Sequence, residues 1–121
     1  MPVGCDLRVE GPLTLHDSEP EPDVAIVRGS PESFVTSHPH TAELAVEVAV
    51  SSLEIDRVRA LIYAEAGLRE YWIVCPEKKR VEVYRQPGAQ GYAERTDFAA
   101  PAALESSALP GVCVELAALF C

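Results

Sequence analysis

Apolar and polar residues alternate with two different periods along this chain, and the change of period divides it into elements. Residues 42–50, AELAVEVAV, alternate as a strand does, so that every second side chain lies on the same face. Leucine and valine occupy one face, and the other carries alanines together with Glu43 and Glu47. We expect Glu43 to be solvated. A shorter strand is predicted over residues 24–27, after a proline-rich approach.

The best helix signal covers residues 51–67, SSLEIDRVRALIYAEAG. Ser51 or Ser52 can cap its N-terminus, and Gly67 suits the position after its last turn. Apolar side chains gather on one side, formed by Val58, Leu61 and Ile62, and a polar stripe runs along another, formed by Asp56, Arg59 and Tyr63. Because a polar stripe beside an apolar face usually points to water, we expect this stripe to be solvated.

The second half of the chain alternates with the period of strands. Residues 70–75, 79–85 and 91–98 predict an antiparallel meander, and the final LPGVCVELAALF predicts a short strand with a terminal turn or helix. This order of elements indicates an α+β (mixed α/β) fold, in which a crossover helix at about residues 52–66 packs on a mixed sheet. The 121 residues are expected to form a single domain, residues 1–121.

Composition narrows the classes of function. The 19 acidic and 10 basic residues give a net charge of −9, which repels a phosphate backbone, so contact with nucleic acid requires a local site or a bound cation. The 4 cysteines are scattered without metal-binding spacing and are expected to be reduced thiols. With no signal peptide and no run of about 20 apolar residues, we expect a cytoplasmic protein without a membrane span.

Asp23 and Glu47 are the candidate metal ligands. If the strands that carry them are neighbours, both carboxylates can point to one face, and their mutual repulsion favours a divalent cation between their oxygens. Magnesium is the natural cation because it prefers oxygen and keeps several waters for chemistry on phosphates. Taken singly, each acid has an ordinary alternative. Asp23 can form a turn after proline, and Glu47 can lie on a solvated face of the sheet.

A longer pattern, over about residues 20–98, is more specific than either acid alone. It consists of Pro22-Asp23 before a strand, Glu47-Val48 followed by Ser51, Asp56 and Tyr63 on the helix, Gly67, Glu70-Tyr71-Trp72 leading into a strand, and Pro76. In these features the chain resembles the Uma-two family of restriction-endonuclease-like bacterial proteins.

The resemblance implies a PD-(D/E)xK nuclease fold and a phosphodiesterase site that depends on Mg²⁺, or Mn²⁺ in its place. Asp23 and Glu47 are the implied metal ligands, helped by the backbone carbonyl of Val48, and a basic residue steadies the attacking hydroxide. The nuclease pattern places a lysine where this chain has Ala49, and the family places one on the following helix, where this chain offers Arg59. Arginine can hold a phosphate through two N–H groups, but its high pKa prevents proton shuttling.

The family pattern also includes a helix and hairpin ahead of the region of Asp23, and the short segment present here is expected to lack that N-terminal helix region. Asp56 and Arg59 are either a surface ion pair or a pair that faces phosphate.

The sequence supports two candidate functions. The first is a magnesium-dependent endonuclease acting on DNA or RNA. The alternative is a catalytically inactive relic that acts in dimerisation or partner binding, because an uncovered sheet face favours self-association. We expect a homodimer.

Overall fold

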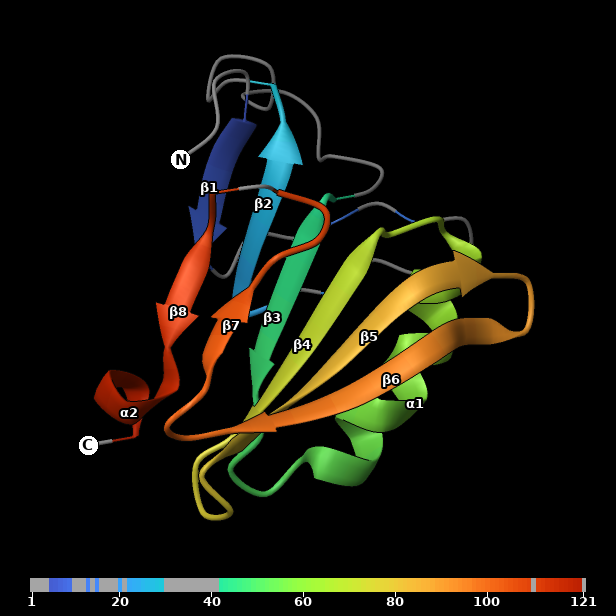
Figure 1. The fold of residues 1–121 in the computed structure, drawn as a ribbon. Coiled ribbons are helices and arrows are strands. Elements are labelled where there is room, and N and C mark those ends of the chain that lie inside the picture. Colours follow the sequence, from blue (N-terminus) through green and yellow to red (C-terminus); the bar gives the residue numbers. More distant parts are fainter. Residues whose placement is uncertain are drawn as a thin grey trace.

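A six-stranded mixed sheet forms the centre of the molecule (Figure 1). The computed structural model describes residues 5–9, 13, 15, 20, 22–29, 42–109 and 111–120. The strands, which lie side by side in sequence order, are β1 (Cys5–Val9), β2 (Val24–Arg28), β3 (Leu44–Val48), β4 (Glu70–Cys75), β5 (Arg80–Gly88) and β6 (Gly91–Ala99). Only β3 and β4 are parallel among these neighbours, and the other pairs are antiparallel.

The parallel step requires a crossover, and α1 (Leu53–Glu65) supplies it between β3 and β4. Figure 1 shows α1 behind the sheet, with a small second sheet in front. That second sheet pairs β7 (Ala103–Glu105) with β8 (Cys113–Glu115), and the short helix α2 (Leu116–Leu119) follows it. The predicted α+β class, the crossover helix and the antiparallel meander are therefore confirmed.

Each face of the main sheet carries its own apolar cluster. The cluster on the α1 face combines alanines and tyrosines with aliphatic side chains, and it includes Ala45, Ala60, Tyr63, Tyr71, Leu68 and Ile73. The cluster on the other face contains Ile26, Leu44, Trp72, Val83, Leu104 and Leu116.

The predicted orientation of α1 is wrong. Its polar stripe contributes buried residues, among them Asp56 and Tyr63, whereas its apolar stripe is exposed, with Val58 61% and Leu61 56% accessible to solvent. The sheet beneath α1 carries buried glutamates, and a helix that offers arginines to them gains ion pairs that an aliphatic face cannot supply. Hydrophobic periodicity alone does not contain that information.

Most boundaries of the predicted strands and of the helix agree with the structure, but the predicted exposure of Glu43 is wrong. The helix ends as predicted, since Gly67 adopts a φ of +77° just after it, a conformation that glycine reaches without strain. Glu43, expected to be solvated, is buried and pairs with Arg28 at 2.6 Å and Arg69 at 3.3 Å. The strands β1 and β7 were not predicted.

Two expectations from composition can be compared with the structure. Cys75 and Cys113, the cysteines whose side chains are described, are free thiols. None of the helices in the described part of the chain combines the length and apolar character needed to cross a membrane.

Candidate functional site

Asp23 and Glu47 interlock at the point where β2 begins and β3 ends. The antiparallel register pairs Val24 with Val46, so Asp23 stands beside Glu47 at the next position. The backbone N–H of Asp23 donates to Glu47 Oε1 at 2.9 Å, and the backbone N–H of Val48 donates to Asp23 Oδ2 at 2.7 Å. Each carboxylate is held by the backbone of the neighbouring strand, and the structure therefore brings the two acids predicted from the sequence together.

Helix α1 brings an arginine and a third acid to the same place. Arg59 Nη1 donates to Glu47 Oε2 at 3.1 Å and lies 3.8 Å from Asp56 Oδ1. Asp56 is buried and accepts a hydrogen bond from Ser52 Oγ at 2.7 Å. Arg59 thus bridges an acid of the strand and an acid of the helix, and the Asp56–Arg59 pair is part of the site wall rather than a surface ion pair.

The balance of charge at this site is unfavourable for Glu47. Its side chain is almost fully buried, with 4% of the residue exposed. Burial raises the pKa of Glu47 above its usual 4.5, and the negative charges of Asp23 and Asp56 raise it further. The hydrogen bond from the Asp23 backbone and the charge of Arg59 lower the pKa of Glu47, but they do not compensate. Three acids, Asp23, Glu47 and Asp56, thus lie around the positive charge of Arg59.

The donor set fits a hard divalent cation. The carboxylates of Asp23 and Glu47 lie on neighbouring strands and offer oxygen atoms, and a cation there would offset the negative charges of Asp23, Glu47 and Asp56. The backbone N–H of Ala49 donates to the carbonyl of Val74 in β4. Since neighbouring residues of a strand point their backbone groups to opposite sides, the N–H and the carbonyl of Val48 point away from β4, toward Asp23. The carbonyl of Val48 therefore lies on the side of the two acids.

The protein would supply few of the ligands of such an ion. Within the described ranges, no three histidine, cysteine, aspartate or glutamate side chains are grouped closely enough to hold a metal together. Two carboxylates and a carbonyl would leave positions for water around a bound cation.

Two buried tyrosines close the inner side of the site. Tyr63 of α1 and Tyr71 of β4 pack edge to face, with ring centroids 4.8 Å apart. The hydroxyl of Tyr71 donates to the backbone carbonyl of Asp56 at 3.0 Å, which fixes the first turn of α1 against β4. The tyrosines keep bulk water from the inner side of the acids, which strengthens electrostatic interactions there.

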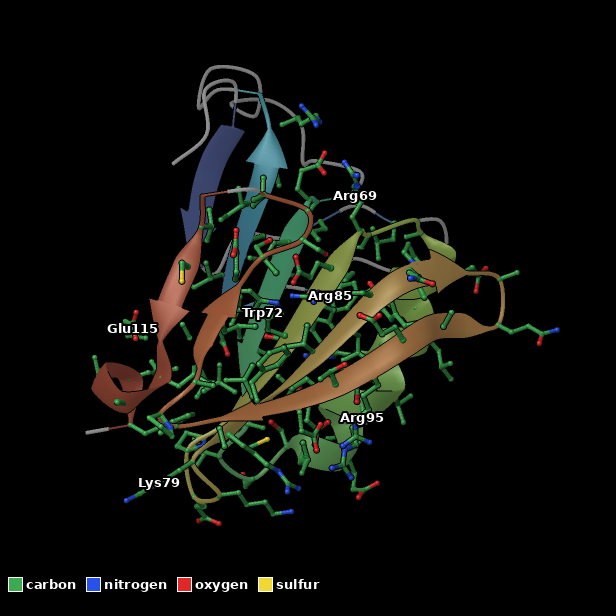
Figure 2. All side chains as sticks on the ribbon, viewed as in Figure 1. Arg69, Trp72, Lys79, Arg85, Arg95 and Glu115 are labelled. Atoms are coloured by element: carbon green, nitrogen blue, oxygen red, sulfur yellow. The ribbon has the colours of Figure 1, made fainter. Side chains whose placement is uncertain are left out.

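A second buried glutamate lies close to the site, and sequence reasoning missed it. Cross-strand register places Glu47, Ile73 and Glu82 in one row across β3, β4 and β5. Glu82 accepts hydrogen bonds from Arg57 Nε at 3.1 Å and Nη2 at 2.5 Å, and Arg95 Nη2 lies 3.1 Å away. Arg95 is labelled on β6 in Figure 2, beside α1. The available signal was an acid between two valines of a strand, the same signal that identified Glu47.

Comparison with known proteins identifies the family of this chain. The family model Uma2, described as "Putative restriction endonuclease", matches residues 3–118. The chain belongs to the Uma2 family. The resemblance found around Asp23 and Glu47 is therefore confirmed, because Uma2 is the Uma-two family. No curated protein matches the sequence.

A solved structure shares the fold of this Uma2 chain. It comes from Anabaena variabilis, is described as "a putative nuclease belonging to DUF820", and superposes with a TM-score of 0.78 at 18% sequence identity. The match covers 97% of this chain and 68% of that chain. At this identity the likeness establishes the fold, which is restriction-endonuclease-like as predicted. The roles of Asp23, Glu47 and Arg59 stay predictions that rest on the geometry above.

Proposed function

We propose that this Uma2 protein is a Mg²⁺-dependent phosphodiester hydrolase of the PD-(D/E)xK type, an endonuclease that acts on DNA. The observation that carries the proposal is the interlocked pair of Asp23 and Glu47, with Arg59 reaching them from α1. The family description and the fold of the solved relative support a nuclease. Manganese, which has similar ligand preferences, would substitute for magnesium.

Three groups of the chain would hold the cation: the carboxylates of Asp23 and Glu47 and the backbone carbonyl of Val48. When bound, the cation supplies charge for the scissile phosphate and lowers the pKa of water. The backbone N–H of Val48 already fixes one oxygen of Asp23, and the backbone N–H of Asp23 fixes one oxygen of Glu47. Both ligands are thus oriented before the cation arrives, which reduces the cost of binding.

Arg59 would exchange one anion for another. Its Nη1 pairs with Glu47 in the structure, and its side chain is 39% exposed, so it can turn toward solvent. Once Glu47 holds a cation, Arg59 would be free to hold a phosphate oxygen of the substrate. Arginine keeps its proton at any working pH, so Arg59 serves to bind and orient phosphate rather than to transfer a proton.

A hollow beside the site offers a path for a substrate. It is lined by residues 49–55, at the junction of β3 and α1, and by Cys75, Glu77 and Lys78, and its volume is about 420 Å³. Lys78 belongs to the exposed turn between β4 and β5, where it can meet a phosphate of the backbone. The net charge of −9 predicts that binding of DNA depends on such local contacts and on added divalent cation.

Cleavage of a supercoiled plasmid in the presence of magnesium tests the proposal. The wild type is expected to nick or linearise the plasmid, and Glu47→Gln and Asp23→Asn are expected to lose this activity. Glu82→Gln is the matched control, because it removes the charge of a buried glutamate in the same cross-strand row without touching the proposed ligands. A wild type inactive with both magnesium and manganese, or an active Glu47→Gln, would contradict the proposal.

One observation favours a second candidate function, self-association without catalysis. Four apolar side chains of α1 are exposed on its outer side: Ile55, Val58, Leu61 and Ile62. We define them as the outer stripe. A second copy of the chain, related by a two-fold axis, can place its own outer stripe against this one, so each copy covers the other.

Charge sets a condition on such a dimer. Glu54 and Glu65 are exposed at the two ends of the outer stripe, and an antiparallel pair of helices brings Glu54 of one copy toward Glu65 of the other. Salt screens this repulsion, so self-association is expected to strengthen as salt is added. Sedimentation equilibrium of the wild type and Val58→Glu at low and high salt measures it. A wild type that is monomeric at every salt concentration would eliminate this candidate.

A further inference from the structure

Tyr63 is the one tyrosine whose hydroxyl has no hydrogen-bond partner among the described residues. The chain has 4 tyrosines, and the other three donate: Tyr71 to the carbonyl of Asp56 at 3.0 Å, Tyr84 to Glu82 at 2.9 Å and Tyr92 to the carbonyl of Leu68 at 2.6 Å. Tyr63 is fully buried, with 0% of its surface exposed. A buried hydroxyl without a partner costs folding free energy, so its retention here calls for an explanation.

The surroundings of Tyr63 point to the acid cluster. On α1 it follows Asp56 by seven residues and Arg59 by four, which places all three on the side of the helix that faces the sheet. Burial raises the pKa of Tyr63 most, the charge of Glu47 raises it further, and Arg59, Asp56 and Asp23 also act on it. The hydroxyl therefore keeps its proton and can act as a donor within the field of these acids.

The neighbouring ring shows that packing alone does not explain the hydroxyl. Tyr71, 4.8 Å away between ring centroids, is equally buried and uses its hydroxyl to tie the first turn of α1 to β4. A phenylalanine at position 63 would fill nearly the same volume and would leave no donor unpaired. The hydroxyl of Tyr63 is therefore available to donate a hydrogen bond to a group that enters the site.

We propose that Tyr63 is a positioning residue that donates a hydrogen bond to a water molecule taken up with the cation beside Glu47. This inference rests on the proposed function, because it requires Asp23 and Glu47 to bind a divalent cation. A water in this position would accept from Tyr63 and donate to a carboxylate of the cluster, which satisfies the partners that a buried water needs. The hydrogen bond adds to the affinity of the site without direct contact between Tyr63 and the cation.

Calorimetric titration with magnesium alone tests the inference, with urea unfolding measured in parallel in the presence of chelator. Tyr63→Phe is expected to weaken magnesium binding about three- to tenfold, the value of one hydrogen bond, and to leave the unfolding midpoint equal or higher. Tyr92→Phe is the matched control, because it removes a hydroxyl that is paired with the backbone carbonyl of Leu68 and not with any of the three acids. It is expected to lower the unfolding midpoint and to bind magnesium as the wild type does.

The outcomes separate failure of the inference from failure of the proposed function. Wild-type affinity in Tyr63→Phe, together with lost binding in Glu47→Gln, would overturn the role of Tyr63 and leave the metal site intact. Wild-type affinity in Glu47→Gln, or no binding by the wild type, would overturn both. A second titration adds dimethyl phosphate at saturating magnesium. If Tyr63→Phe weakens only this step, the hydroxyl serves a phosphate oxygen and the assignment to water is wrong.

Discussion

The tripeptide Val-Glu-Val occurs twice in the chain, at residues 46–48 in β3 and 81–83 in β5, and the two copies behave differently. Glu47 and Glu82 lie in one row of the sheet, both are buried, and each meets an arginine of α1. Even so, the pKa of Glu82 is below the usual 4.5 and the pKa of Glu47 is above it. Local sequence is the same at both sites, so the difference comes from the surroundings.

The surroundings differ in which charges gather around each carboxylate. Burial raises the pKa of Glu82, but hydrogen bonds from Arg57 and Tyr84 and the charge of Arg95 outweigh it. Burial raises the pKa of Glu47 most, Asp23 and Asp56 raise it further, and the Asp23 backbone N–H and Arg59 lower it without outweighing them. A buried acid paired with cations supports the fold, whereas a buried acid among acids lowers stability and gains affinity for a cation.

The largest expected effect on stability comes from removing the arginine partner of Glu82. Arg57→Ala is expected to lower the free energy of unfolding by about 3 kcal/mol, near the lower end of the cost of breaking a buried pair, because Arg95 still faces the acid. Arg59→Ala is expected to cost less, since Arg59 offers Glu47 one contact and not two. Urea unfolding with chelator measures both. Equal losses would show that the two arginines are equivalent.

The next effect concerns the glutamates themselves, with opposite signs. Glu82→Gln is expected to lower the free energy of unfolding by about 2 kcal/mol, because three charge-assisted contacts are weakened. Glu47→Gln is expected to leave it unchanged or to raise it by up to about 1 kcal/mol, because a buried charge beside other acids is removed. Thermal or urea unfolding without divalent cations checks the pair. A strongly destabilised Glu47→Gln would place Glu47 among the structural acids.

Competition between Arg59 and the cation gives a third prediction. Arg59→Gln removes a positive charge beside Glu47, so magnesium is expected to bind about tenfold more tightly, or about 1.4 kcal/mol in favour of the complex. Plasmid cleavage is expected to slow in the same variant, because phosphate loses its arginine. Calorimetry and the cleavage assay read the two effects separately. Weaker magnesium binding in Arg59→Gln would mean that Arg59 supports the cation site instead of competing with it.

The smallest effect is on pH dependence, measured with chelator. The folded state binds the Glu47 proton more tightly than the unfolded state, so the wild type loses stability relative to Glu47→Gln as the pH rises above 4.5 toward the folded pKa. Glu82 has a lowered pKa, so the wild type loses stability relative to Glu82→Gln as the pH falls below 4.5 toward the folded pKa. The stability of the wild type relative to each variant, plotted against pH, should therefore fall with rising pH for Glu47→Gln and rise with rising pH for Glu82→Gln. Parallel slopes would contradict the assigned charges.

The sequence predicted the elements better than the way in which they pack. The strand at residues 70–75 and the helix with Gly67 after it agree with the structure, because period and end signals are local properties. The strands β1 and β7 were missed, and they hold 5 and 3 residues in segments without a strong alternation. The orientation of α1 was reversed, because periodicity treats charged side chains as solvated.

The site was predicted only in part for a related reason. Asp23 and Glu47 carried a family pattern, Arg59 was the basic residue found where the family places a lysine, and the structure brings the three together. Glu82 and Arg57 carried no such pattern, and they are 25 residues apart in sequence. Their pairing depends on how α1 lies across β5, and neither the helix nor the strand encodes it alone. Long-range pairs of this kind become visible only when the fold is known.

The most direct test of the account is the effect of magnesium on the free energy of unfolding in three proteins: the wild type, Glu47→Gln and Glu82→Gln. Magnesium at roughly ten times the dissociation constant is expected to add about 1.4 kcal/mol to the wild type and to Glu82→Gln, and nothing to Glu47→Gln. If magnesium stabilises Glu47→Gln as much as the wild type, or stabilises none of the three, then the acids at the ends of β2 and β3 do not form a cation site.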